Sequence, residues 1–214
     1  MRKRIGFTLI ELLIVVAIIA ILAAIAVPNF LEAQVRSKVS RVMNDERAIA
    51  TALEAYRVDF NRGPLEFNEY YWLVLQPAGI PGEMRHLCYK QLTTPVAYMT
   101  GFLRDPFGEK RAIKDGRDLP EMAYYTYQAF YDPTYYGGAC ERCTANGYYW
   151  VLYSVGPSGR DVVAGLAEIW PETYLSLGCP KDRGAAYIYD ATNGTSSFGR
   201  IHRTNKGVLT GSSL

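Results

Sequence analysis

The chain has 214 residues, of which 21% are charged, and its formal net charge is +2. This length allows one folded domain beside a helical anchor. Arg2, Lys3 and Arg4 supply three of the positive charges, and without them the net charge falls to −1. Because no basic surplus remains elsewhere, nucleic-acid binding is not expected.

Residues 7–27 form an apolar run of about 21 residues that contains one charge, Glu11. At about 1.5 Å per helical residue, this run is roughly 30 Å long and can cross the core of a bilayer. The basic residues before it favour a cytoplasmic N-terminus and a single pass. A carboxylate in such a segment is costly, which calls for a functional explanation.

Residues 6–13 read G-F-T-L-I-E-L-L, and Pro28 follows the apolar run. This pattern resembles the processing motif of the type IV pilin and type II secretion pseudopilin family. The resemblance implies cleavage after Gly6 by a prepilin peptidase, N-methylation of Phe7, and retention of the apolar helix. It further implies assembly into a helical homo-oligomeric fibre.

The same resemblance implies a location and a set of partners. The chain would sit in the bacterial inner membrane with its head in the periplasm, where the fibre would form. Its partners would be further copies of itself, other pseudopilins and the inner-membrane assembly platform.

Two other interpretations of the N-terminus remain open. A secretory signal peptide needs an apolar region of about 7–15 residues and a small-residue cleavage site. Ala24-Ile25-Ala26 fits such a site, but a signal peptide gives no reason for Glu11. A single-pass anchor without any role in assembly is the second alternative.

Glu11 has a chemical role that follows from its position. Cleavage after Gly6 would create an ammonium on Phe7, one helical turn before Glu11. A neighbouring subunit displaced along a fibre axis would offer its own amine to this carboxylate. The pair would then set the register between helices that otherwise pack through apolar side chains.

The helix is expected to continue beyond Pro28 to about Arg62. Glu46 is the one position of its apolar stripe that is not apolar, and Pro28 is expected to bend or locally melt the helix. Gly63 and Pro64 are typical of a helix end. We therefore expect a leader at 1–6, a helix at 7–62 whose part from 28 to 62 is amphipathic, and a β-rich head at 63–214. The stripe comprises Leu31, Val35, Val39, Val42, Ile49, Leu53, Tyr56 and Phe60.

Strands are predicted at residues 124–131, 148–155, 186–189 and 200–203. Asn193-Gly194 predicts a hairpin turn between the last two. Residues 105–108 read D-P-F-G and residues 153–156 read Y-S-V-G. These resemble the D-P-W-G turn and the Y-S-x-G strand of the pseudopilin G branch. The expected fold is α+β and pilin-like, with a long N-terminal helix on a small antiparallel sheet with long loops.

The four cysteines are Cys88, Cys140, Cys143 and Cys179. An even number of cysteines outside the cytoplasm favours two disulfides, in any of three pairings. The C-x-x-C spacing of residues 140–143 also suits zinc or redox chemistry, so a zinc site and free thiols stay open.

We do not expect an enzyme. The two histidines, His86 and His202, have no nearby pattern of a catalytic triad, and a phosphate-binding loop is missing from the sequence.

Calcium is a cofactor that the resemblance to pseudopilin G suggests, in the loop after the Y-S-x-G strand. The acids nearest to that place are Asp161, Asp182 and Asp190. Calcium needs about 6–8 oxygen ligands, and these three acids are widely spaced. Ordinary turn and surface carboxylates are the alternative interpretation.

The favoured function is therefore a structural subunit of a type II secretion pseudopilus that drives protein export. A type IV pilin is the alternative within the family. A membrane-tethered binding module is the alternative outside it.

Overall fold

The computed structural model describes residues 8–65, 77–78, 85–108, 113–114, 117–118, 123–129, 145, 147–157, 188–190 and 199–209. The chain divides into two compact units, Met1–Ser37 and Lys38–Leu214. We call the second unit the head. The described structure consists of one long helix, a short 3-10 helix and two antiparallel sheets.

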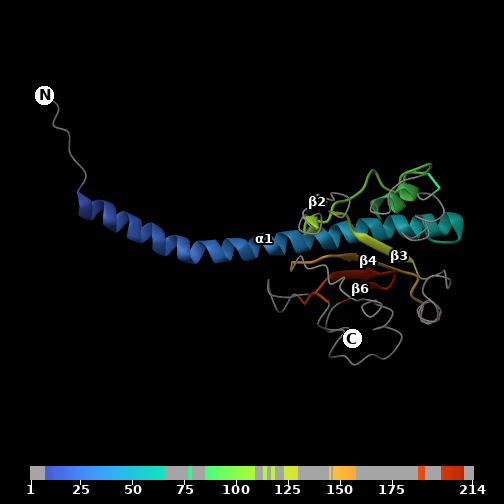
Figure 1. Cartoon of the computed structure of the whole chain (residues 1–214). Helices are drawn as coiled ribbons and strands as arrows, with labels where there is room; N and C mark the ends of the chain where they lie inside the picture. Colours follow the sequence, from blue (N-terminus) through green and yellow to red (C-terminus); the bar gives the residue numbers. More distant parts are fainter. Residues whose placement is uncertain are drawn as a thin grey trace. The chain divides into compact units, whose positions relative to one another are not determined.

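Helix α1 spans Leu9–Phe60 and contains Pro28 without interruption. Pro28 was expected either to bend the helix or to melt it locally. The helix is not melted there, but its blue first half is bent in Figure 1. The helix ends at Phe60 because Asn61 adopts a left-handed conformation, with φ of 53°. Asparagine tolerates this conformation and ends helices as glycine does. The sequence instead predicted Gly63 as the residue that follows the helix end.

The part of α1 within the head buries one apolar stripe. Val39, Val42, Ile49 and Leu53 are buried along it, at the helical spacing that brings residues onto one face. Glu46 lies on the same stripe and has 0% of its surface exposed. The predicted exception in the apolar pattern therefore lies in the core of the head.

The main sheet has four antiparallel strands in the order β3-β4-β5-β6. It runs alongside the second half of α1 in Figure 1. The strands are β3 Thr126–Ala129, β4 Trp150–Ser154, β5 Ile201–Thr204 and β6 Gly207–Leu209. A second sheet pairs β1 Ile113–Lys114 with β2 Arg117–Asp118, and the 3-10 helix η2 covers Arg85–Leu92.

The strand register decides which side chains face α1. Trp150 bonds to Glu54 of α1, so this face of β4 is turned toward the helix. Leu152 lies on the same face because side chains alternate along a strand. Leu152 pairs with Arg203 on β5, which places Arg203 on the helix-facing side.

One predicted connection is wrong. Ile188 forms a parallel bridge with Arg200, which excludes an antiparallel hairpin between residues 186–189 and 200–203. The hairpin instead joins β5 to β6 through Asn205 and Lys206. The expected α+β, pilin-like fold is confirmed, with a long N-terminal helix and a small antiparallel sheet.

Candidate functional site

The first turn of α1 holds the carboxylate that the sequence singled out. Glu11 Oε2 accepts hydrogen bonds from the backbone N–H of Thr8 at 2.8 Å and from the Thr8 hydroxyl at 2.7 Å. The Glu11 N–H donates back to Thr8 Oγ1 at 3.3 Å. This reciprocal arrangement is a capping box, which satisfies donors that a helix N-terminus leaves unpaired. Glu11 therefore has partners within its own helix.

The apolar residues of α1 after Glu11 are exposed as far as Leu31. In the part of the chain that the structure describes, α1 is the one helix long and apolar enough to cross a membrane. An exposed apolar surface of this extent marks a membrane or protein interface. This surface and the Glu11 carboxylate together form the candidate assembly site.

In the head, Asp105 connects the D-P-F-G turn of residues 105–108 with the Y-S-V-G strand of residues 153–156. Its Oδ1 accepts hydrogen bonds from the Phe107 N–H and the Ser154 hydroxyl, both at 2.9 Å. Its Oδ2 accepts the Val155 N–H, also at 2.9 Å. The carboxyl is buried, with 2% exposure. One acid thus ties the D-P-F-G turn to the Y-S-V-G strand about fifty residues later.

The glycines of both motifs lie where a side chain would not fit. A Cβ on Gly108 would come within 2.8 Å of the Ala123 backbone. Gly156 has φ of 75°, and a Cβ there would lie 2.4 Å from the Gly199 carbonyl oxygen. Contacts this short require glycine, and the φ of Gly156 requires it as well. The two motifs therefore pack against each other as one unit. We call this contact between residues 105–108 and 153–156 the joint around Asp105.

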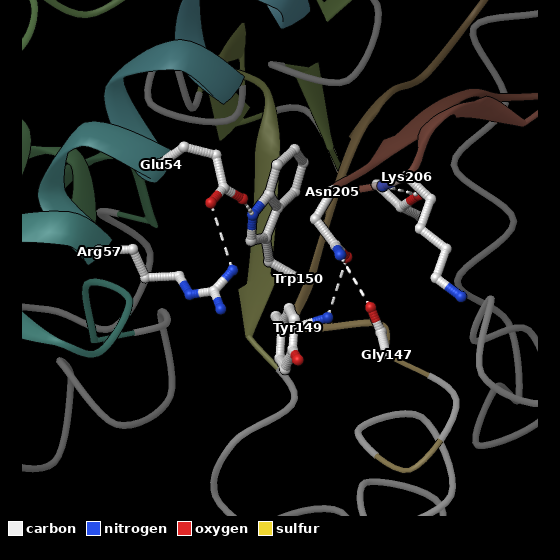
Figure 2. A network of polar contacts seen from close by, with 8 residues as sticks. Glu54, Arg57, Gly147, Tyr149, Trp150, Asn205 and Lys206 are labelled. Atoms are coloured by element: carbon white, nitrogen blue, oxygen red, sulfur yellow. Dashed lines mark hydrogen bonds and ion pairs between the residues drawn. The ribbon is translucent and has the colours of Figure 1, made fainter.

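A second polar network fastens the end of α1 to the sheet (Figure 2). Trp150 Nε1 donates to Glu54 Oε1 at 2.7 Å, and Arg57 Nη1 donates to Glu54 Oε2 at 3.2 Å. The Arg57 guanidinium also lies over the Tyr149 ring, 4.0 Å from its centroid. These contacts fix the last turns of α1 on the start of β4.

The same network continues to the β5–β6 turn. The Tyr149 N–H donates to Asn205 Oδ1 at 3.0 Å, and Asn205 Nδ2 donates to the Gly147 carbonyl at 2.8 Å. Lys206 Nζ lies 4.2 Å from the centroid of the Tyr148 ring. In Figure 2 the Asn205 side chain bridges the two segments, so one amide holds the turn in place.

We expect Trp150→Phe to lower the free energy of unfolding of the head by about 1.5–3 kcal/mol, because the Trp150 N–H donates to a charged group. Thermal unfolding of the full-length protein in detergent micelles, followed by near-ultraviolet circular dichroism, measures this loss. Arg57→Gln is the control, with a loss of only about 1 kcal/mol, since it removes a partly exposed ion pair with Glu54 and the contact with the Tyr149 ring. Equal losses in both variants would contradict a stabilising role for the hydrogen bond from Trp150 to Glu54.

Several predicted site residues lie outside the described residues. These are Gly6 and Phe7 of the processing site, Asp161 and Asp182 of the calcium prediction, and three of the cysteines (Cys140, Cys143 and Cys179). Asp190 is described and half-buried, and Cys88 is buried in η2. The described residues contain no cluster of three or more metal-binding side chains. Calcium, zinc and the disulfides therefore stay predictions.

The joint around Asp105 was not predicted as a unit. The sequence signal for it was present, because each of the two motifs stands out separately. Nothing in their spacing indicates that the turn and the strand meet. The network of Glu54 and Trp150 has no local pattern in the sequence that would reveal it.

Comparison with known proteins bears on both parts of this site. Residues 1–27 match the family described as "Prokaryotic N-terminal methylation motif". Type II secretion system core protein G of Pseudomonas aeruginosa is 32% identical over 125 residues, which are 55% of this chain and 88% of that protein. The chain belongs to the type IV pilin and type II secretion pseudopilin family.

Matches to two other members of the family cover a smaller share of those proteins. Type IV major pilin protein PilA of Myxococcus xanthus is 39% identical over 122 residues, but the match covers only 54% of that protein. Type IV major fimbrial protein FimA of Dichelobacter nodosus is 55% identical over 58 residues, or 37% of its length. No solved structure matches the chain significantly.

Proposed function

We propose that this chain is a structural, non-enzymatic subunit of a type II secretion pseudopilus. The observation that carries the proposal is the match to core protein G, which extends beyond the helix and covers 88% of that protein. The joint around Asp105 adds support, because it makes one unit of the two motifs that resemble the pseudopilin G branch.

The features of the N-terminus suggest how the subunit is inserted, processed and assembled. Arg2, Lys3 and Arg4 hold the N-terminus in the cytoplasm, and the head lies in the periplasm. Prepilin peptidase cleaves after Gly6, and Phe7 is methylated. Subunits then leave the inner membrane and pack their apolar helices into a fibre, assisted by other pseudopilins and the assembly platform.

A type IV pilin is the second candidate, and the 39% identity to the Myxococcus pilin favours it. Deleting the gene in the native bacterium separates the two functions. A pseudopilus subunit predicts that exported proteins accumulate in the periplasm while surface fibres persist. Loss of surface fibres with normal export would instead identify a pilin. Loss of neither would favour a tethered binding module.

Complementation strengthens this experiment. The wild-type gene should restore export. A Gly6→Val gene should not, because a β-branched side chain next to the cleaved bond would hinder processing. Restoration of export by uncleaved Gly6→Val protein would contradict the proposed route of assembly.

A further inference from the structure

We propose that Glu46 is a proton-binding residue of the head core. The folded head holds its side chain as a neutral carboxylic acid, and loss of that proton loosens the packing of α1 on the sheet. This inference concerns the head alone and does not depend on which fibre the subunit forms.

Glu46 lies between Val42 and Ile49 on the buried stripe of α1 and has no exposed surface. Neither of its carboxyl oxygens has a hydrogen-bond partner of good geometry among the described residues. An ionised carboxylate in such surroundings is far more costly to bury than a neutral acid.

Two neighbouring acids, Asp45 and Asp105, already have hydrogen-bond partners of their own. Asp45 on α1 accepts a hydrogen bond from the Tyr125 hydroxyl at 2.9 Å and lies 3.5 Å from Arg41. Asp105 accepts the three donors of the joint described above. Both acids therefore have their own partners, and both disfavour a further negative charge on Glu46.

Among the residues that the structure describes, Arg203 on β5 is the cation that faces Glu46 across the interface between α1 and the sheet. Within the described part of the chain, the two side chains form no ion pair within 4.0 Å, and Arg203 Nε is buried without a hydrogen-bond partner. Arg203 therefore attracts the carboxyl only from a distance. Burial is the largest influence on the pKa of Glu46. It outweighs both the attraction of Arg203 and the lowering effect of the Ser154 backbone, and raises this pKa well above 4.5. The groups facing Glu46 are Asp45, Asp105, Tyr89, Tyr125, Arg203 and the backbone of Ser154.

The direction of the pH effect follows from this raised pKa. Below pH 4.5 both the folded and the unfolded chain hold the proton, and the contribution of Glu46 to stability is fully present. It is lost as the pH rises through the higher pKa of the folded state. His202 acts in the opposite direction, since burial lowers its pKa to about 3 and acid therefore destabilises the head. His202 is present in the wild type and in every Glu46 variant, so its effect on stability cancels when their melting temperatures are compared at one pH.

The test uses full-length protein in detergent micelles, with melting temperatures measured at pH 5, 7 and 9. All three tryptophans follow residue 63, so their fluorescence reports on the head. Glu46→Gln keeps the shape of the neutral acid and should melt close to the wild type at pH 5. At pH 9 it should melt at least about 3 °C higher, since one pKa unit corresponds to about 3–5 °C in a protein of this size.

Glu32→Gln on the exposed part of α1 is the matched control and should show no such divergence. Glu46→Leu, which completes the apolar stripe, should be at least as stable as the wild type at pH 9. Infrared spectra of the wild type at pH 7 should contain the carbonyl band of a protonated acid that Glu46→Leu lacks. Equal losses of melting temperature in both Glu46 variants at every pH, or identical infrared spectra, would overturn the proposal.

Discussion

Asp105→Ala is expected to lower the free energy of unfolding of the head by about 3–6 kcal/mol. The substitution leaves three buried donors unsatisfied, each at a cost of about 1–3 kcal/mol. These donors are the N–H groups of Phe107 and Val155 and the hydroxyl of Ser154. The loss is large against the usual total stability of about 5–15 kcal/mol. In thermal unfolding of the full-length protein, it should lower the melting temperature by about 6–24 °C.

Two further variants separate the contributions to this loss. Ser154→Ala removes one donor to Asp105 and also the acceptor of the buried Gly156 N–H, so it should cost about 2 kcal/mol. Asp105→Asn keeps an acceptor for Phe107 and Ser154 but turns an amide N–H toward the Val155 N–H, so its effect should lie between the other two. If Asp105→Ala cost no more than Ser154→Ala, the two motifs would not depend on this acid.

Glu11→Ala is expected to abolish fibre assembly while leaving membrane insertion and cleavage largely intact. The change removes a charge from an apolar helix, so insertion becomes easier. It also removes the directional contact between staggered helices that a neighbour's Phe7 amine would provide. The variant should therefore accumulate as cleaved monomer in the inner membrane, measured by fractionation and by fibre yield on overexpression.

The capping box makes a sharper comparison available. Glu11→Gln keeps an oxygen that accepts the Thr8 N–H and hydroxyl, but it carries no charge. If the charge sets the register, Gln should fail as Ala does. Normal fibres from Glu11→Gln would show that helix capping is the role of this residue. Normal fibres from Glu11→Ala would show that apolar packing alone sets the register.

Much of the fold could be predicted because its signals are local. The period of apolar residues located α1, and it marked Glu46 as the exception that proves to be buried. Alternating residues around 148–155 located β4, since Trp150–Ser154 lies within that range. The motif of residues 6–13 singled out Glu11, although its hydrogen bonds to Thr8 were not predicted.

What could not be predicted depends on contacts between distant segments. The pairing of Ile188 with Arg200 is parallel, and the Asn193-Gly194 signal favoured an antiparallel hairpin instead. Strand β6 was missed because three residues give too short a pattern. The joint at Asp105 brings together segments whose separation in the sequence carries no signal. Helix η2 has no strong periodicity and was likewise not predicted.

The central claim is that this chain is processed and retained as a fibre subunit. An intact-mass and N-terminal measurement on protein purified from its native membrane tests that claim most directly. The mature chain should begin at Phe7, carry one added methyl group and retain the whole of α1. A mature chain that begins near Val27 would identify a signal peptide, and an uncleaved chain that retains Met1 would identify a plain anchor. Either result would contradict the claim.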